Sequence, residues 1–150
     1  MFNTRICFVR HSETNWNAER RMQGHIDIPL NANGISQAER LANALIRVKH
    51  SFDVIYSSDL ERALHTANAV ARALSLDVQI TPRLRERNVG KLQGLLLAEA
   101  PVLLPEIWQR HIARELDHDL GGGESIRTFH QRMQDILELF LNEHRGQSVL

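Results

Sequence analysis

The apolar positions of the chain fall into short runs that alternate with longer segments of helical spacing. The runs at residues 6–9, 52–56 and 78–81 predict strands, and residues 147–150 predict the opening of a further strand. The first run is continuously apolar, which is typical of a strand buried on both faces. A run of this kind needs a neighbouring strand on each edge and a packed layer on each side.

Between the runs, apolar residues recur every three or four positions, which predicts amphipathic helices. Residues 31–34 (Asn-Ala-Asn-Gly) have the composition of a turn. Ser36 and Glu39 are then expected to open the first helix as a capping box. Asp59 is expected to cap the second helix, and Ser125 a long third one.

The segment between the second and third helices is less regular. Residues 83–94 are polar and predict a loop, and residues 95–116 are helical in character but interrupted by Pro101 and Pro105. The glycines at 121–123, with Glu124, fit a turn before a capped helix and a substrate-binding role equally well. Nothing here has the composition of a linker between domains.

Strands that alternate with helices predict parallel pairing, because a parallel connection needs a crossover helix. The expected fold class is therefore α/β, a three-layer α/β/α sandwich with a mostly parallel sheet. A length of 150 residues is enough for one domain with a core of its own, so residues 1–150 are expected to form a single domain.

Charge and composition exclude several kinds of partner. Lys and Arg together number 18, as do Asp and Glu, so the chain has no net positive charge to attract nucleic acid or an anionic membrane. No stretch has the apolar length of a membrane-spanning helix, and the N-terminus does not resemble a signal peptide. The single cysteine, Cys7, suits a reducing compartment, so a cytoplasmic protein is expected.

The polar residues that follow the predicted strands indicate where the chemistry lies. In parallel sheets, ligands bind beyond the carboxyl ends of the strands. Three separate segments deliver cationic, nucleophilic and acidic side chains to that edge. These side chains are Arg10, His11, Ser57, Ser58, Asp59, Arg62, Arg85, Glu86 and Arg87.

This set of residue types is suited to phosphoryl transfer. The planar guanidinium of Arg matches phosphate oxygens and stays charged, and helix N-termini favour the same anion. A histidine can act as a covalent nucleophile, which divides a difficult displacement into two steps. A carboxyl group can protonate the leaving oxygen and then accept a proton from water.

Residues 10–17 (Arg-His-Ser-Glu-Thr-Asn-Trp-Asn) resemble the Arg-His-Gly-Glu-Thr signature of the histidine phosphatase, or phosphoglycerate mutase-like, superfamily. The likeness continues in the family's order through residues 21–42, 57–67, 84–94 and 121–125. It spans almost the whole chain, so accidental matching is improbable.

The resemblance implies a role for each matching position. His11 corresponds to the phosphorylated nucleophile and Glu86 to the proton donor and acceptor, whereas a Glu between two Arg residues would also fit a solvated salt-bridge loop. The phosphoryl group would be held by Arg10, Asn17 and Arg62, and the substrate side by Gln23 and Gly24. The implied ligand is a small phosphorylated substrate, with no metal and no cofactor.

Two departures from the family pattern stand out. Ser12 replaces the usual Gly, a change that is expected to be tolerated. The family also has a second catalytic histidine in a Ser-His-Gly segment of a later strand, and no residue here matches it. His144 lies on the wrong side of Gly146 to replace it. We expect that the sequence is a fragment of a longer gene product, since a truncated relative would expose the edge of a central strand.

Three activities remain open from the sequence. Gln23-Gly24 and the short segment between Gly94 and Gly121 favour the phosphatase branch. A phosphoglycerate mutase primed by 2,3-bisphosphoglycerate is the alternative, which Trp108 and Arg110 faintly support. A binder of phosphorylated ligands without turnover is the third.

Overall fold

The computed structural model describes residues 3–48 and 51–150, and its strands pair in parallel, as predicted. One pair joins β1 to β4, and the other joins β2 to β3. A single parallel bridge between Val54 and Val149 connects the two pairs, so β4 lies between β1 and the segment that leads into β2. The strands are β1 (Arg5–Ile6), β2 (Ile55–Ser57), β3 (Val78–Ile80) and β4 (Ser148–Val149).

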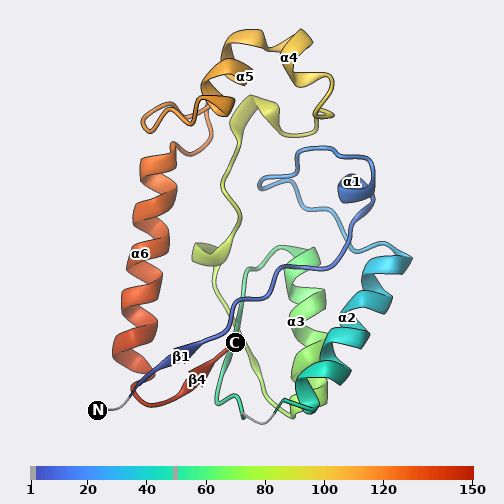
Figure 1. Ribbon diagram of the computed structural model, residues 1–150, viewed down its shortest axis with the longest axis vertical. Coiled ribbons are helices and arrows are strands. Elements are labelled where there is room, and N and C mark those ends of the chain that lie inside the picture. The colour runs from blue at the N-terminus through green and yellow to red at the C-terminus, as the bar shows by residue number, and fades with distance from the viewer. Residues whose placement is uncertain (1–2, 49–50) are drawn as a thin grey trace.

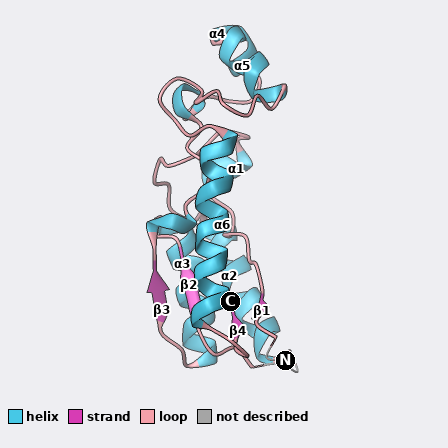
Figure 2. Cartoon of the chain, turned by 90° about the vertical axis from the view of Figure 1, so that its left-hand side faces the viewer, coloured by secondary structure: helices cyan, strands magenta, loops and turns pink. Residues whose placement is uncertain are grey.

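Helices cover both faces of these strands, which confirms the three-layer α/β/α prediction. Figures 1 and 2 place α2 (Ala32–Ile46) and α3 (Glu61–Leu74) on one side and α6 (Ile126–Glu143) on the other. Alternate strand residues point to opposite sides, so each layer has its own core. One core contains Ala42, Ile55, Val70 and Ala71, and the other contains Ile136, Phe140 and Val149.

The first strand is shorter than its apolar run. The amide of Cys7 still donates to the carbonyl of Val149 at 2.8 Å, but Phe8 and Val9 are 73% and 41% exposed. Within the described residues, β4 runs beside only the start of this segment, and no other strand flanks Phe8 and Val9. The prediction that the whole run is buried on both faces is therefore wrong for these two residues.

Helix α2 begins earlier than predicted. The side chain of Asn31 caps it by accepting a hydrogen bond from the amide of Gly34 at 2.8 Å, and Ser36 lies inside the helix. The expected turn at residues 31–34 is therefore the cap and first turn of α2. Gly34 is required there, because a Cβ atom at this position would lie 2.0 Å from the carbonyl oxygen of Glu13.

The other two caps give opposite outcomes. Ser125 caps α6 by accepting a hydrogen bond from the amide of Thr128 at 3.0 Å, as predicted. Asp59 does not cap α3, which starts at Glu61 without a side-chain cap. Its carboxylate instead accepts hydrogen bonds from Arg85 on both of its oxygens, because a two-point pair with a guanidinium is stronger than a single bond from a backbone amide.

Residues between β3 and α6 form a smaller layer above the strands (Figure 1). Its elements are η1 (Pro82–Leu84), η2 (Gly90–Leu92), α4 (Ala100–Leu103) and α5 (Pro105–Ile112), and α1 (Asn15–Ala18) lies nearby. Pro101 and Pro105 lie in the first turns of α4 and α5, where proline is tolerated. In the described residues, no helix is both long and apolar enough to cross a membrane.

Candidate active site

The segment that follows β1 carries His11 and is tied to α3. The amide of Ser12 donates to the hydroxyl oxygen of Thr66 at 3.0 Å, and this hydroxyl donates to the carbonyl of Arg62 at 2.8 Å. Ser12 is buried and its backbone φ is not positive, so no glycine is needed at this position. The segment around His11 is thus fixed to the first turns of α3.

The ring of His11 has one nitrogen engaged and one free to react. Nδ1 lies 2.7 Å from the carbonyl oxygen of Ser12, which can only accept, so Nδ1 carries the proton. Burial lowers the pKa of His11, and the nearby charges of Arg62 and Arg10 lower it further, against the opposing effects of the Ser12 carbonyl and Glu86. The ring is therefore held neutral, with Nε2 as its basic nitrogen.

Arg62 is a buried cation that holds the substrate-side loop. Its side chain is among the largest that are fully buried, with 1% of the residue exposed. Nη2 donates to the carbonyl of Gly24 at 2.7 Å and Nη1 to that of Ile26 at 2.9 Å. Gly24 has a φ of +55°, and a Cβ atom there would lie 2.4 Å from Oε1 of Gln93. This left-handed backbone beside the Gln93 side chain therefore favours glycine at position 24.

Asn17 and Gln23 meet at the side chain of Thr14. The Oδ1 of Asn17 lies 3.0 Å from the amide nitrogen and from the hydroxyl oxygen of Thr14, and Oε1 of Gln23 lies 2.9 Å from the same hydroxyl. The carbonyl end of the Asn17 amide thus faces the protein. In the described part of the chain its NH₂ group has no acceptor, so it is available to an anion in the cavity.

Glu86 enters the site from the loop after β3. Its Oε1 accepts a hydrogen bond from the amide of Arg87 at 2.8 Å. The neighbouring arginines are engaged elsewhere, since Nε of Arg85 donates to Asp59 at 2.7 Å and Nε of Arg87 donates to the carbonyl of Glu124 at 2.8 Å. Neither neighbouring guanidinium is directed at His11, which leaves Arg10 and Arg62 as the cations nearest to it.

Two adjoining cavities share Arg10, His11, Arg62 and Glu86 in their walls. The first, of about 320 Å³, is mostly apolar and extends along residues 6–9 and 55–58 towards Leu150. The second, of about 360 Å³, is the more polar and also contains Asn17, Gln23 and Gly24. The seven residues to which the resemblance gives a role therefore all line the polar cavity. Of the other side chains expected at this edge, Ser57, Ser58 and Arg85 line only the apolar cavity.

Other walls of the polar cavity were not predicted as site residues. They are Trp16, Arg20, Arg21, Met22, Val89 and Leu97. The guanidinium of Arg21 lies 5.7 Å from the centre of the Trp16 ring and donates to the carbonyl of Gly94 at 2.6 Å. Residues 89 and 97 reach the cavity only through the folding of the segment after β3, and no local pattern signals it.

His144 lies away from this cavity, as its place in the sequence predicts. It follows the C-terminal end of α6, where Nε2 lies 3.0 Å from the Tyr56 hydroxyl and Nδ1 lies 2.8 Å from Oε1 of Gln147. Across residues 3–48 and 51–150, no three His, Cys, Asp or Glu side chains gather as a possible metal site.

The chain belongs to the histidine phosphatase superfamily (branch 1), whose family model matches residues 6–150. The resemblance inferred from the sequence motifs is thereby confirmed. Among solved structures, that of Bacillus stearothermophilus YhfR superimposes with a TM-score of 0.85 at 32% identity, covering 99% of this chain and 72% of that one. This likeness also confirms the α/β fold class.

Two curated relatives from Arabidopsis thaliana match nearly the whole chain. Phosphoglycerate mutase-like protein 4 is 40% identical over 147 residues, which cover 97% of this chain and 64% of the relative. A metal-independent phosphoserine phosphatase is 39% identical over 149 residues, which cover 98% of this chain and 62% of the relative. The chain thus spans less than two thirds of the length of either relative.

Proposed function

We propose that this protein is a phosphomonoester hydrolase that acts on small phosphorylated metabolites through a phosphohistidine intermediate at His11. The observation that carries the proposal is the polar cavity in which His11, Arg10, Arg62 and Glu86 meet. The name of the phosphoserine phosphatase relative supports hydrolysis without a metal. The charge balance and the single cysteine support a cytoplasmic enzyme without a nucleic-acid partner.

In the first step, the Nε2 lone pair of His11 attacks the phosphorus atom of the ester. A new N–P bond forms while the P–O bond to the leaving group breaks, and the electron pair of that bond stays on the oxygen. The carboxyl group of Glu86 gives its proton to this oxygen, which departs as an alcohol. Arg10, Arg62 and the NH₂ group of Asn17 stabilise the phosphoryl oxygens as charge shifts onto them.

In the second step, water attacks the phosphorus atom of phosphohistidine. The Glu86 carboxylate accepts a proton from this water, and the N–P bond breaks with its electron pair returning to Nε2 of His11. Inorganic phosphate leaves, and both residues regain their starting protonation states. The fixed proton on Nδ1 keeps the ring in the same tautomer throughout.

The leaving group is expected to lie between the phosphate-binding residues and the outer walls of the polar cavity. Met22 and Leu97 offer apolar contacts there, and Arg20 adds a cation. A volume of about 360 Å³ is in the range of pockets that hold small ligands, so a phosphorylated metabolite fits it. Gln23 and Gly24 are proposed to shape this side through the loop that Arg62 holds.

The test is phosphate release from O-phosphoserine, glycerol 2-phosphate and p-nitrophenyl phosphate by the protein as its gene produces it. Hydrolysis without added 2,3-bisphosphoglycerate is expected, together with a trapped phosphoprotein that is absent from the His11→Ala variant. If no substrate releases phosphate and no phosphoprotein forms, the proposed hydrolase activity is wrong. Ligand affinity that persists in His11→Ala would then favour a binder.

A mutase is the second candidate, favoured by the name of the mutase-like relative. Such an enzyme would stay inactive until primed by 2,3-bisphosphoglycerate, and would then interconvert phosphoglycerates without net loss of phosphate. Measuring both reactions on one preparation, with and without the bisphosphate, separates the two activities.

A further inference from the structure

Arg132, in the second turn of α6, makes an ion pair with Glu124 just before that helix. Its Nε donates to Oε1 of Glu124 at 2.8 Å, and its Nη2 donates to Oε2 at 2.7 Å. Both side chains are largely withdrawn from water, with 18% and 16% of their surfaces exposed. Two parallel hydrogen bonds of this kind fix the plane of the guanidinium.

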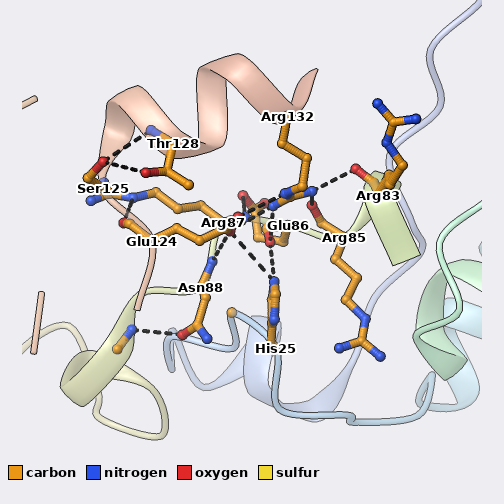
Figure 3. Close-up of polar contacts among 12 residues, drawn as sticks. His25, Arg83, Arg85, Glu86, Arg87, Asn88, Glu124, Ser125, Thr128 and Arg132 are labelled. Atoms are coloured by element: carbon orange, nitrogen blue, oxygen red, sulfur yellow. Dashed lines mark hydrogen bonds and ion pairs between the residues drawn. The ribbon is translucent and has the colours of Figure 1, made fainter. Parts of the chain in front are cut away.

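The remaining donors of Arg132 bind the backbone of the loop that carries Glu86, as Figure 3 shows. Nη1 donates to the carbonyls of Arg83 and Arg85 at 2.6 and 2.8 Å, and Nη2 approaches that of Glu86 at 3.3 Å. One guanidinium thus satisfies acceptors on three residues of a loop that has little regular structure. The planar group suits this task because its five N–H donors have fixed directions.

Glu124 binds the same loop on its far side. Its Oε2 accepts a hydrogen bond from the amide of Asn88 at 2.9 Å. Burial alone would raise the pKa of Glu124, but the hydrogen bonds from Arg132 and the Asn88 amide lower it below its ordinary value. The ionised carboxylate therefore holds both Arg132 and the chain two residues after Glu86.

His25 holds Glu86 from the substrate-side loop. Its Nε2 lies 2.8 Å from the carbonyl oxygen of Glu86, and because that oxygen only accepts, Nε2 is the donor. The same nitrogen lies 3.8 Å from Oε2 of Glu124. The carbonyl of Glu86 is thus held from two elements, while its side chain lines the cavity with His11.

We propose that Arg132 and Glu124 are positioning residues, which fix the main chain of Glu86 so that its carboxyl group faces the leaving oxygen of a phosphoester bound at His11. The inference rests on the proposed function, and it assigns a role to Glu124 and to a residue of α6, neither of which either step of the reaction uses directly. A loss of this positioning should impair proton transfer more than phosphate binding or attack by His11.

The test compares two esters that differ in their need for a proton. p-Nitrophenolate leaves without protonation, whereas the alkoxide of glycerol 2-phosphate needs it. For Arg132→Lys and Glu124→Gln we expect kcat/KM for glycerol 2-phosphate to fall about 100-fold and kcat/KM for p-nitrophenyl phosphate to fall less than about 3-fold, because kcat/KM reports the step in which the leaving group departs and not the later hydrolysis of phosphohistidine. Arg127→Gln is the control, since that residue, also in α6, forms an exposed pair with Asp117 at the surface.

The possible results distinguish failure of the proposed hydrolase function from failure of the positioning role of Arg132 and Glu124. If wild-type protein hydrolyses neither ester, or if Glu86→Gln lowers kcat/KM equally for both, the proposed function is wrong at that step and this inference falls with it. Glu86→Gln is expected to lower kcat/KM mainly for the alkyl ester. If it does so, but Arg132→Lys and Glu124→Gln lower kcat/KM equally for both esters or for neither, the two residues are only structural and the inference is overturned. Glu124→Gln keeps the shape of its side chain, so it protects the test against misfolding of Arg132→Lys.

Discussion

The Nδ1 atom of His11 lies 2.7 Å from the carbonyl oxygen of Ser12, so its own neighbour in the chain sets the tautomer of the proposed nucleophile. A carbonyl oxygen accepts and never donates, which leaves Nε2 of His11 with the free lone pair. The backbone of Ser12 is also fixed at its other polar group, because the Ser12 amide donates to the hydroxyl oxygen of Thr66. The orientation of the ring is therefore built into the backbone and α3.

The first prediction concerns the position of the phosphoryl group. Phosphate trapped on the protein should be attached to Nε2 of His11 and not to Nδ1, since Nδ1 is already a donor. Nuclear magnetic resonance of the ¹⁵N-histidine-labelled phosphoprotein distinguishes the two isomers through the coupling between nitrogen and phosphorus. The His11→Asn variant should give no phosphohistidine signal, and a signal from Nδ1 would contradict the tautomer assigned here.

The second prediction concerns stability against pH. The pKa of His11 is lowered in the folded state from 6.5, so below that value the unfolded chain binds the proton more readily. The contribution of His11 to the free energy of unfolding is therefore fully present above pH 6.5 and is lost as the pH falls through the pKa of the folded state. The total loss is about 1.4 kcal/mol for each pH unit by which the folded pKa lies below the unfolded pKa.

Urea unfolding at about pH 8 and about pH 5.5 measures this effect. The free energy of unfolding should fall less between these values for His11→Asn than for the wild type. His111, whose pKa burial also lowers, should contribute in the same direction, so His111→Asn serves as a parallel variant. Equal losses in the wild type and His11→Asn would show that His11 does not titrate differently on folding.

The third prediction concerns the buried guanidinium of Arg62. Arg62→Gln should lower the free energy of unfolding by about 3 kcal/mol, since the carbonyls of Gly24 and Ile26 lose charged donors in a buried site. Binding of orthovanadate should weaken at least about 10-fold, because one of the cations near His11 is gone.

Arg72→Gln is the matched control on the same helix. Its guanidinium is 63% exposed and pairs with Glu39 at the surface, so its loss should change stability by less than about 0.5 kcal/mol. Denaturant unfolding and vanadate titration of both variants check the comparison. Similar effects for the two arginines would argue against a special role for Arg62.

The fourth prediction concerns the packing of α2 against the segment that follows His11. Gly34→Ala should destabilise the protein by more than about 2 kcal/mol, because its Cβ atom would lie 2.0 Å from the Glu13 carbonyl and must displace backbone. Phosphate binding should weaken as residues 11–14 shift.

Gly122→Ala gives the contrasting case. Its φ is +95°, but no atom lies within 4 Å of the added Cβ, so only the backbone cost of about 1 kcal/mol is expected, with phosphate binding unchanged. Thermal unfolding of the two alanine variants measures the difference. A Gly34→Ala variant as stable as Gly122→Ala would mean that the contact with Glu13 relaxes freely.

The sequence by itself determined the order of strands and helices, the parallel pairing and the family. These features depend on hydrophobic period and on a local motif, both of which are properties of neighbouring residues. For the same reason it placed His11, Arg62 and Glu86 at one edge of the sheet, since strands of one direction end at the same side. Their catalytic roles remain predictions from the resemblance.

Only the tertiary structure decided how these residues are held. Whether Asp59 caps a helix or binds Arg85 depends on a loop 26 residues away. Local sequence preferences for helix caps do not include a partner so distant in the chain, so they do not predict this pair. The hydrogen bond from Arg132 to the carbonyl of Glu86 joins residues 46 positions apart in the sequence. A buried guanidinium donates to backbone carbonyls that regular secondary structure leaves without a partner. The packing of the folded chain decides which carbonyls these are, so the local sequence does not identify them.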